Sequence, residues 1–244
     1  MTACLARFEP IHLEHNSVQH STLSIIFSND HFVAVEKPAG WLSVPSRQGE
    51  DDQRPCVGRV LEIQLQLRLW PVHRLDLEVT GILLFAKDAS AHKAANQWFE
   101  QRVVHKTYEA ITAVGEAINL NIPLTWECVM LRGKKRAYLS PHGKPSLTTA
   151  TPISLVKLKD SPGLLWQLSP HTGRPHQLRF DLARHGYPIL GDQLYGSQRP
   201  YSDGIALRCV KLDFSDCPRA SDFGLPRAVA ATTLPQLLGL EGNS

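Results

Sequence analysis

The sequence has few cysteines, and it lacks any long apolar run. Its five cysteines are scattered along 244 residues, odd in number and never spaced as Cys-x-x-Cys. Such usage argues against a disulfide framework or a zinc knuckle and favours a reducing compartment. No apolar stretch approaches the roughly 20 residues that span a membrane, and the N-terminal residues lack the pattern of a signal peptide. We therefore expect a cytoplasmic protein without membrane contact.

The motifs that hold nucleotides and metals are missing as well. The sequence contains no GxxxxGK[ST] phosphate loop, no GxGxxG dinucleotide fingerprint and no HExxH metal motif. Its histidines and cysteines do not have zinc-finger spacing. No GxSxG elbow supports a Ser-His-Asp nucleophile. The residues by themselves therefore give no support for a metal site or a nucleotide cofactor.

A strong excess of one charge is absent too, since the net charge is only +3 with histidine neutral. This value does not by itself indicate a nucleic-acid partner, but the basic residues are unevenly placed. One cluster surrounds Gly133 and a second lies among three histidines: Arg132, Lys134, Lys135 and Arg136, then Arg174, Arg179 and Arg184. Each cluster is either an ordinary solvated face or a local surface that contacts phosphates.

The apolar periodicity predicts more strands than helices in a chain long enough for one large domain or two small ones. Strands are expected at residues 24–27, 31–37, 82–86, 106–114, 148–157, 164–168 and 205–214. Helices are expected at residues 56–69, from Asp88 or Ser90 to about 102, and from Pro175 to just before Gly186. Residues 115–145 have little pattern, and the chain after Cys217 looks irregular until 234–240. We predict an α+β fold with a mainly antiparallel, mixed sheet and flanking helices.

The stretch VHRLDLEVTGILLFAKD, residues 72–88, contains an unusual acid. Asp76 stands just before a run with the length and composition of a buried strand. A carboxylate there needs a cation or several hydrogen-bond donors, because otherwise it becomes protonated. Arg179 is a candidate partner, since it shares one face of the predicted third helix with His176. A structural ion pair at the start of a strand is the simpler interpretation.

Four segments together resemble the RluA family of pseudouridine synthases. They are KPAGWLSVP (37–45), HRLDLEVTGILLFAK (73–87), KTY (106–108) and TGRPHQLRFDLARHGYPILGDQLYG (172–196). Each is moderately specific alone, but all four occur in the family's order and at compatible spacing. The resemblance extends from about Ile25 to Phe214.

Four positions depart from the family's pattern. Val79 and Thr80 replace a common Thr-Ser pair, and Pro175 stands where Thr or Ser is usual. Arg208 occupies a strand position at which the family often has His. The last departure concerns contacts to the substrate rather than the catalytic residues.

The resemblance implies a pseudouridine synthase fold, with the helices and loops around a central RNA-binding cleft. We expect a catalytic domain at residues 24–216, an N-terminal extension at 1–23 and a C-terminal tail at 217–244. The first signature comes early in the chain, so we expect a compact member that has the catalytic domain alone. We also expect a monomer.

The resemblance further implies that the chain isomerises uridine to pseudouridine in rRNA, tRNA or both, without a cofactor. Asp76 would attack the anomeric carbon of the ribose or remove the neighbouring ribose proton, and these alternatives stay open. Arg179 would be its ionic partner. Tyr108 would lie against the target uracil, and Leu178 would pack near the base.

The same resemblance implies the residues that contact RNA. A stacked uridine has to flip out of its helix to reach Asp76, and Arg74 with His73 would fill the vacated space. Lys37 and the cluster of Arg132, Lys134, Lys135 and Arg136 would bind the RNA backbone. Thr80, Arg174 and His176 would complete the substrate and RNA contacts.

Two other functions remain possible on the same residues. A non-catalytic RNA-binding protein could have this fold, and an N-glycosidic hydrolase could release the base. The joint presence of Asp76, Tyr108 and Arg179 favours the synthase, because binding alone does not need the acid.

Overall fold

A single mixed sheet runs through the molecule in the computed structural model, which describes residues 22–46, 51–115, 118–159 and 161–239. Its strands lie in the order β1-β2-β4-β10-β5-β9-β8-β6-β7, while β3 pairs with β4 and β11 pairs with β10. Among the pairings between these strands in the described ranges, that of β4 with β10 is parallel and the others are antiparallel. The predicted α+β class with a mainly antiparallel sheet is confirmed.

The bounds of these elements follow the periodicity of the sequence closely in most places. The strands are β1 (Ile25–Ser28), β2 (Phe32–Lys37), β3 (Trp70–Pro71), β4 (Thr80–Ala86), β5 (His105–Ala113), β6 (Leu124–Arg132), β7 (Ala137–Leu139), β8 (Lys144–Val156), β9 (Gly163–Pro170), β10 (Leu207–Asp213) and β11 (Ala228–Ala230). The helices are α1 (Val57–Leu65), α2 (Ala89–Glu100), α3 (Gln177–Arg184) and α4 (Leu234–Leu237), with short 3-10 turns η2 (Gln193–Tyr195) and η3 (Ala220–Phe223).

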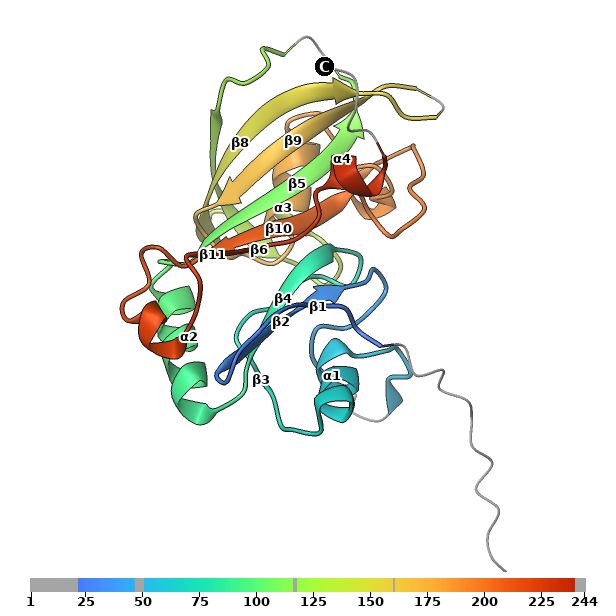
Figure 1. Ribbon diagram of the computed structural model, residues 1–244. Helices are drawn as coiled ribbons and strands as arrows, with labels where there is room; N and C mark the ends of the chain where they lie inside the picture. Colours follow the sequence, from blue (N-terminus) through green and yellow to red (C-terminus); the bar gives the residue numbers. More distant parts are fainter. Residues whose placement is uncertain (1–21, 47–50, 116–117, 160, 240–244) are drawn as a thin grey trace, which may run out of the picture.

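The parallel contact between β4 and β10 joins two halves of the sheet (Figure 1). Strands β1, β2 and β4 lie with α1 and α2 on one side of this contact, and β5, β8, β9 and β6 lie with α3 on the other. Gly81 makes the contact possible, because a Cβ at this position would collide with the backbone of Cys209. Its φ of +105° is also a conformation that glycine adopts easily. Asp76, just before β4, therefore lies at the junction of the halves.

The middle of the chain is more regular than expected. Residues 115–145, predicted to have little pattern, contain β6 and β7, and β8 begins at Lys144. Alternate residues of β6 such as Trp126 and Met130 are buried, but their neighbours Val129 and Leu131 are exposed. These exposed apolar residues conceal the period of two that normally identifies a strand.

The third helix begins later than predicted. Pro175 and His176 lie outside α3, and His176 is its N-cap with a positive φ of 58°. The Gln177 side chain accepts hydrogen bonds from Arg174 N at 3.0 Å and from Thr172 Oγ1 at 2.8 Å. It also donates to Leu147 O on β8 at 3.0 Å. These bonds fold residues 172–176 into a turn against β8, so the helix starts at Gln177.

The C-terminal segment differs from the expected tail. β11 pairs with β10, and several side chains pack into the main core: Cys217, Ala220, Leu225, Val229 and Leu234. Phe223 meets the ring of Trp98 edge-on at 5.9 Å, which fastens the segment to α2. Within the described part, residues 217–239 thus belong to the same core as the predicted catalytic domain. Most of the predicted N-terminal extension, residues 1–21, lies outside the described residues, as do residues 240–244.

No helix in the described ranges combines the length and the apolar character that crossing a membrane requires. The cysteines that the structure describes, Cys56, Cys128, Cys209 and Cys217, are free thiols. Cys4 lies outside the described residues.

Candidate active site

A pocket of about 360 Å³ lies where the two halves of the sheet meet. One wall is the segment before β4, which contains Asp76. The other walls come from β5, the end of β6 and the turn that leads into α3. We call it the active-site pocket; its lining includes Arg74, Asp76, Lys106, Tyr108, Arg132, Arg174, His176, Leu178 and Arg179. Its volume lies within the range of small-ligand sites, so one nucleoside can occupy it.

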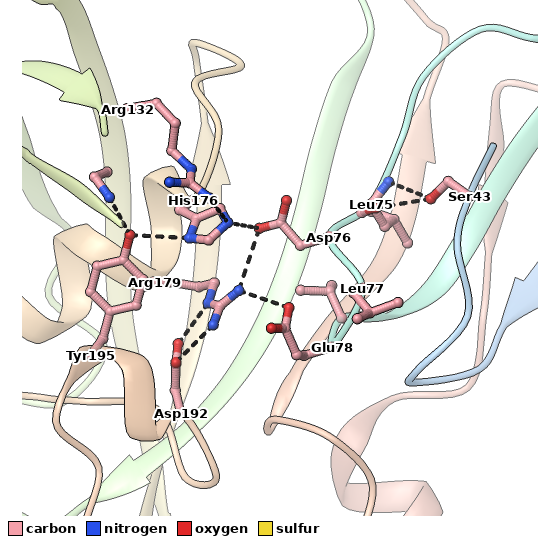
Figure 2. A network of polar contacts seen from close by, with 12 residues as sticks. Ser43, Leu75, Asp76, Leu77, Glu78, Arg132, His176, Arg179, Asp192 and Tyr195 are labelled. Atoms are coloured by element: carbon pink, nitrogen blue, oxygen red, sulfur yellow. Dashed lines mark hydrogen bonds and ion pairs between the residues drawn. The ribbon is translucent and has the colours of Figure 1, made fainter. Parts of the chain in front are cut away.

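The backbone on the N-terminal side of Asp76 is held by Ser43. Its hydroxyl oxygen accepts a hydrogen bond from Leu75 N at 3.0 Å and donates one to Leu75 O at 2.9 Å. Both residues are buried. Figure 2 shows this pair on the side of Asp76 away from His176 and Arg179, toward which the carboxylate points. The KPAGWLSVP loop (37–45) thus holds the segment HRLDLEVTGILLFAK (73–87), which contains Asp76.

The backbone on the C-terminal side of Asp76 is held by Lys37. Its ammonium donates to the carbonyl oxygens of Pro38, Leu77 and Val79 at 2.9, 3.0 and 2.8 Å. The side chain is fully buried, and burial lowers the pKa of Lys37 to about 8. The predicted contact of Lys37 with RNA backbone is therefore wrong for this structure, since its donors are already satisfied inside the protein. Its role is to fix the loop that presents Asp76.

Arg179 lies within ion-pair distance of Asp76, but it binds other acids more closely. Its Nη1 is 3.9 Å from Asp76 Oδ2. Nε and Nη2 donate to the two carboxylate oxygens of Asp192 at 2.7 and 2.8 Å, and Nη1 donates to Glu78 Oε2 at 2.8 Å. Burial alone would lower the pKa of Arg179, but the bonds and charge of Asp192 raise it. The guanidinium is a fixed positive charge beside Asp76.

His176 is the second basic side chain beside Asp76. Its Nε2 lies 3.9 Å from Asp76 Oδ2 and 3.3 Å from Arg132 Nη2. Its Nδ1 lies 3.1 Å from the hydroxyl of Tyr195, which in turn accepts a hydrogen bond from Ala137 N at 2.7 Å. Burial lowers the pKa of His176 even though Asp76 acts in the opposite direction. A neutral imidazole therefore faces the carboxylate at neutral pH.

Tyr108 and Leu178 contribute apolar surface to the same pocket. Both side chains are largely buried and still line the pocket. Tyr108 lies across from Cys209 on the neighbouring strand β10. Burial raises the pKa of Tyr108 well above its ordinary value, so the phenol stays protonated.

Residues 31–184 match the sequence model of the RNA pseudouridylate synthase family, which is more than half of the chain. This chain belongs to that family. The dual-specificity RNA pseudouridine synthase RluA of Vibrio vulnificus (strain CMCP6) is 34% identical to the synthase over 194 residues, 78% of this chain and 76% of the relative. The tRNA pseudouridine synthase C of Vibrio cholerae (serotype O1) is 31% identical, covering 79% of this chain and 80% of the relative.

Solved structures share the fold of the synthase. The structure titled Human RNA Pseudouridylate Synthase Domain Containing 1 has a TM-score of 0.70 and covers 89% of this chain and 87% of that chain, at 23% identity. The predicted pseudouridine synthase fold and the resemblance to RluA relatives are confirmed.

His73 and Thr80 lie elsewhere than predicted. His73 stacks on Phe99, with ring centroids 5.0 Å apart, and its Nε2 accepts a hydrogen bond from Leu84 N at 3.0 Å. Burial lowers the pKa of His73 to about 3. Thr80 is buried and lines a different pocket, beside Lys37 and Arg208. Neither residue lines the active-site pocket, so their predicted substrate contacts are not supported by the synthase's structure.

Arg208, which replaces a family histidine, also points away from the active-site pocket. Its guanidinium forms a two-point ion pair with Glu36, at 2.5 and 2.6 Å, and donates to Thr232 O at 2.6 Å. The departure at this position therefore changes the packing beside β2 rather than the pocket around Asp76.

The predicted basic cluster divides between two places. Arg132 ends β6 and lines the active-site pocket, whereas the next three basic residues are exposed in the turn before β7: Lys134, Lys135 and Arg136. Arg74 is exposed at the rim, and Arg174 lines the pocket while donating to Pro145 O at 2.9 Å. The RNA contacts of these residues stay predictions.

Sequence reasoning missed several residues that shape the site of the synthase. Asp192 and Tyr195 lie in GDQLYG, the end of the third signature, and Ser43 lies in the first signature. Lys106 opens the KTY segment and also lines the pocket. Position within a signature was the available signal, but each residue's partner comes from another part of the chain. In the described part of the synthase, no three His, Cys, Asp or Glu side chains gather into a candidate metal site.

Proposed function

We propose that this enzyme converts specific uridines to pseudouridine in rRNA, tRNA or both, with Asp76 as the catalytic residue and without a cofactor. In this isomerisation the bond from ribose C1′ to uracil N1 breaks, and a bond from C1′ to C5 forms. The proton on C5 leaves, and N1 gains a proton. The observation that carries the proposal is the Asp76 carboxylate in a nucleoside-sized pocket, 3.9 Å from both Arg179 and His176.

Asp76 has two possible roles in this reaction. It can attack C1′ and form a covalent intermediate, or it can remove the proton from C2′. Both roles require the ionised carboxylate, which the positive charge of Arg179 favours. The bonds from Ser43 and Lys37 to the neighbouring backbone hold the carboxylate in place, which supports either role.

Tyr108 would lie against the uracil ring during these steps. Its buried phenol is protonated, since burial raises the pKa of Tyr108. It would therefore position the base and pass on a proton rather than act as a phenolate base. Leu178 would supply the apolar contact that keeps the detached uracil in the pocket while it turns.

Arg74 would act at the rim when the uridine leaves its helix. Flipping a base out of a stack costs a few kcal/mol, and less for an unpaired base. The exposed guanidinium of Arg74, two residues before Asp76, is well placed to occupy the space that the base leaves. Of the two Vibrio relatives, one is named a dual-specificity RNA pseudouridine synthase and the other a tRNA pseudouridine synthase. These names support tRNA as one candidate substrate and a test of more than one kind of RNA. A cytoplasmic location and a monomeric state stay predictions.

A tritium-release assay tests the proposal. Transcripts of tRNA and rRNA labelled at C5 of uridine are incubated with wild type, with Asp76→Asn, and with the surface control Asp222→Asn. We expect wild type and Asp222→Asn to release tritium from one or both RNAs, and Asp76→Asn to release none while still binding RNA.

The other functions give different products. Release of free uracil would indicate an N-glycosidic hydrolase. Salt-sensitive binding without release from either RNA would favour a non-catalytic RNA-binding protein. Substantial release by Asp76→Asn would remove Asp76 from its assigned role.

A further inference from the structure

A second groove opens beside the active-site pocket. It has a volume of about 480 Å³ and lies between the end of α2, the start of β5 and residues 169–174. We call it the side groove. It shares part of its wall with the active-site pocket: Lys106, Pro170, Thr172, Gly173 and Arg174. The two spaces are therefore neighbours along one wall, and a chain leaving the pocket past these residues enters the groove.

The side groove carries an excess of positive charge. Arg102, Lys106 and Arg174 line it, and Glu100 is the carboxylate among its lining residues. Its histidines already have partners: His105 pairs with Asp216 at 2.6 Å, and His171 lies 2.9 Å from Thr149 Oγ1. A groove with a cationic wall attracts phosphates.

Lys106 stands where the two spaces meet. It precedes Tyr108 by two residues on β5, so both side chains lie on the same side of the strand. In the described part of the chain its ammonium makes no hydrogen bond or ion pair. Burial, and to a lesser degree Arg102, lower the pKa of Lys106. A half-buried ammonium without a counter-charge is stabilised by any anion that reaches it.

Gly173 leaves the ammonium accessible from the groove. Outside residues 172–174, the nearest atom to a Cβ built on Gly173 is Lys106 Nζ, at 3.8 Å, and no other atom lies within 4 Å. Gly173 therefore places no side chain beside the ammonium, on the wall that the pocket and the groove share. A phosphate can approach there without displacing a side chain.

A flipped uridine remains bonded to the RNA chain through two phosphates. One of these phosphates and the nucleotide beyond it need a path out of the active-site pocket. We propose that the side groove is this path, and that Lys106 contacts the phosphodiester that joins the target uridine to its neighbour. Arg102 contacts the backbone farther out. This inference rests on the proposed function, because it takes RNA as the ligand of the pocket.

Substitution of Lys106 tests the inference through two quantities, the Michaelis constant and the salt dependence of binding. The full-length chain is compared as wild type, Lys106→Gln, Lys106→Arg and the control Lys157→Gln, an exposed lysine after β8. The probes are the unmodified tRNA and rRNA transcripts of the tritium-release assay. Arg102→Gln is a second variant at an exposed position, where folding is not at risk.

Loss of one phosphate contact in a single strand should reduce the slope of log K against log salt by about 0.7. We expect Lys106→Gln and Arg102→Gln each to show this reduction, and we expect Lys157→Gln to match wild type. Lys106→Gln should raise KM about 10-fold at low salt with a much smaller change in kcat, which corresponds to about 1.4 kcal/mol. Lys106→Arg keeps the charge and should restore most of the affinity.

Two results would overturn the inference. One is an unchanged salt slope and KM in Lys106→Gln. The other is a fall in kcat with unchanged KM, which would mean that Lys106 acts on Tyr108 or on the base. Failure of the proposed function is distinguishable, because wild type would then release no tritium. The salt slopes on the same transcripts would still show whether Lys106 contacts a phosphate.

Discussion

Arg179 binds Asp192 more closely than it approaches Asp76. Its Nε and Nη2 are 2.7 and 2.8 Å from the oxygens of Asp192, whereas its Nη1 is 3.9 Å from Asp76. Asp192 lies in the loop after α3 and is almost completely buried, as is Arg179. The two-point bond fixes the plane of the guanidinium. Asp192 is therefore the residue that aims the positive charge at Asp76.

Loss of this anchor should reduce both stability and activity. Asp192→Asn removes the buried carboxylate of Arg179 and leaves the guanidinium with the more exposed Glu78 and Asp76. Removing one partner of a buried pair costs about 3–5 kcal/mol, and the remaining acids should keep the loss near the lower end. The freed guanidinium also turns away from Asp76, so kcat should fall as well. Urea unfolding and tritium release measure the two effects. Glu78→Gln is the matched control, because Glu78 is 39% exposed and an exposed pair contributes about 0–1 kcal/mol. Equal losses of stability in the two variants would contradict the assigned role of Asp192.

The two hydrogen bonds between the Ser43 hydroxyl and the backbone of Leu75, which we call the Ser43 clamp, can be tested by substitution. Ser43→Ala leaves the buried N–H and C=O of Leu75 without partners, which should cost about 1–3 kcal/mol of unfolding free energy. The looser loop should lower kcat with little change in KM, and a displacement of about 1 Å suffices for a 100-fold loss. Ser221→Ala, at an exposed serine of η3, serves as the control. Normal kcat in a destabilised Ser43→Ala protein would show that the clamp serves folding alone.

His73 should make stability depend on pH. Its folded-state pKa of about 3 is below the unfolded value of about 6.5, so the unfolded chain binds the proton first as pH falls. Stability should therefore decrease below pH 6.5, by up to about 2 kcal/mol at pH 5 from this residue. His73→Gln keeps an acceptor for Leu84 N but cannot take up the proton. The difference in urea midpoint between pH 7.5 and pH 5 should be smaller in the variant than in wild type. The same difference in both proteins would contradict this assignment.

Arg74 should matter most when the target uridine is stacked. Arg74→Ala removes the side chain that would fill the space of the flipped base, while Asp76 and its anchors stay in place. We expect kcat/KM to fall about 10-fold more on a stem-loop than on an unpaired oligonucleotide with the same uridine, because unstacking costs a few kcal/mol. Tritium release from the two substrates measures this ratio. An equal loss on both would indicate a simple phosphate contact.

β5 could be predicted because polar and apolar residues alternate along it. β2, β4 and β9 were predictable for a different reason, since each contains a short continuous apolar run with the length of a buried strand. β6 and β7 were missed because Val129 and Leu131 are exposed apolar residues on β6. β11 was missed because it is short and gains its stability from pairing with β10, far away in sequence.

The signatures alone led to Asp76, Tyr108, Leu178 and Arg179, which the structure brings to one pocket. They did not distinguish a side chain that faces the pocket from one that holds its walls. Lys37 and His73 each stand in a signature, and both are turned inward by partners that the sequence does not reveal. The same limit hid Asp192, whose partner Arg179 lies on α3.

By itself, the sequence determined the class of fold, the family and the acid at the start of β4, because these depend on local periodicity and on short motifs. The tertiary structure decided which charges surround that acid. Ion pairs and buried hydrogen bonds form between groups distant in sequence, such as Lys37 with Val79 and Arg179 with Glu78. Their geometry depends on how the two halves of the sheet meet at Gly81 and Cys209, and no local pattern encodes that contact.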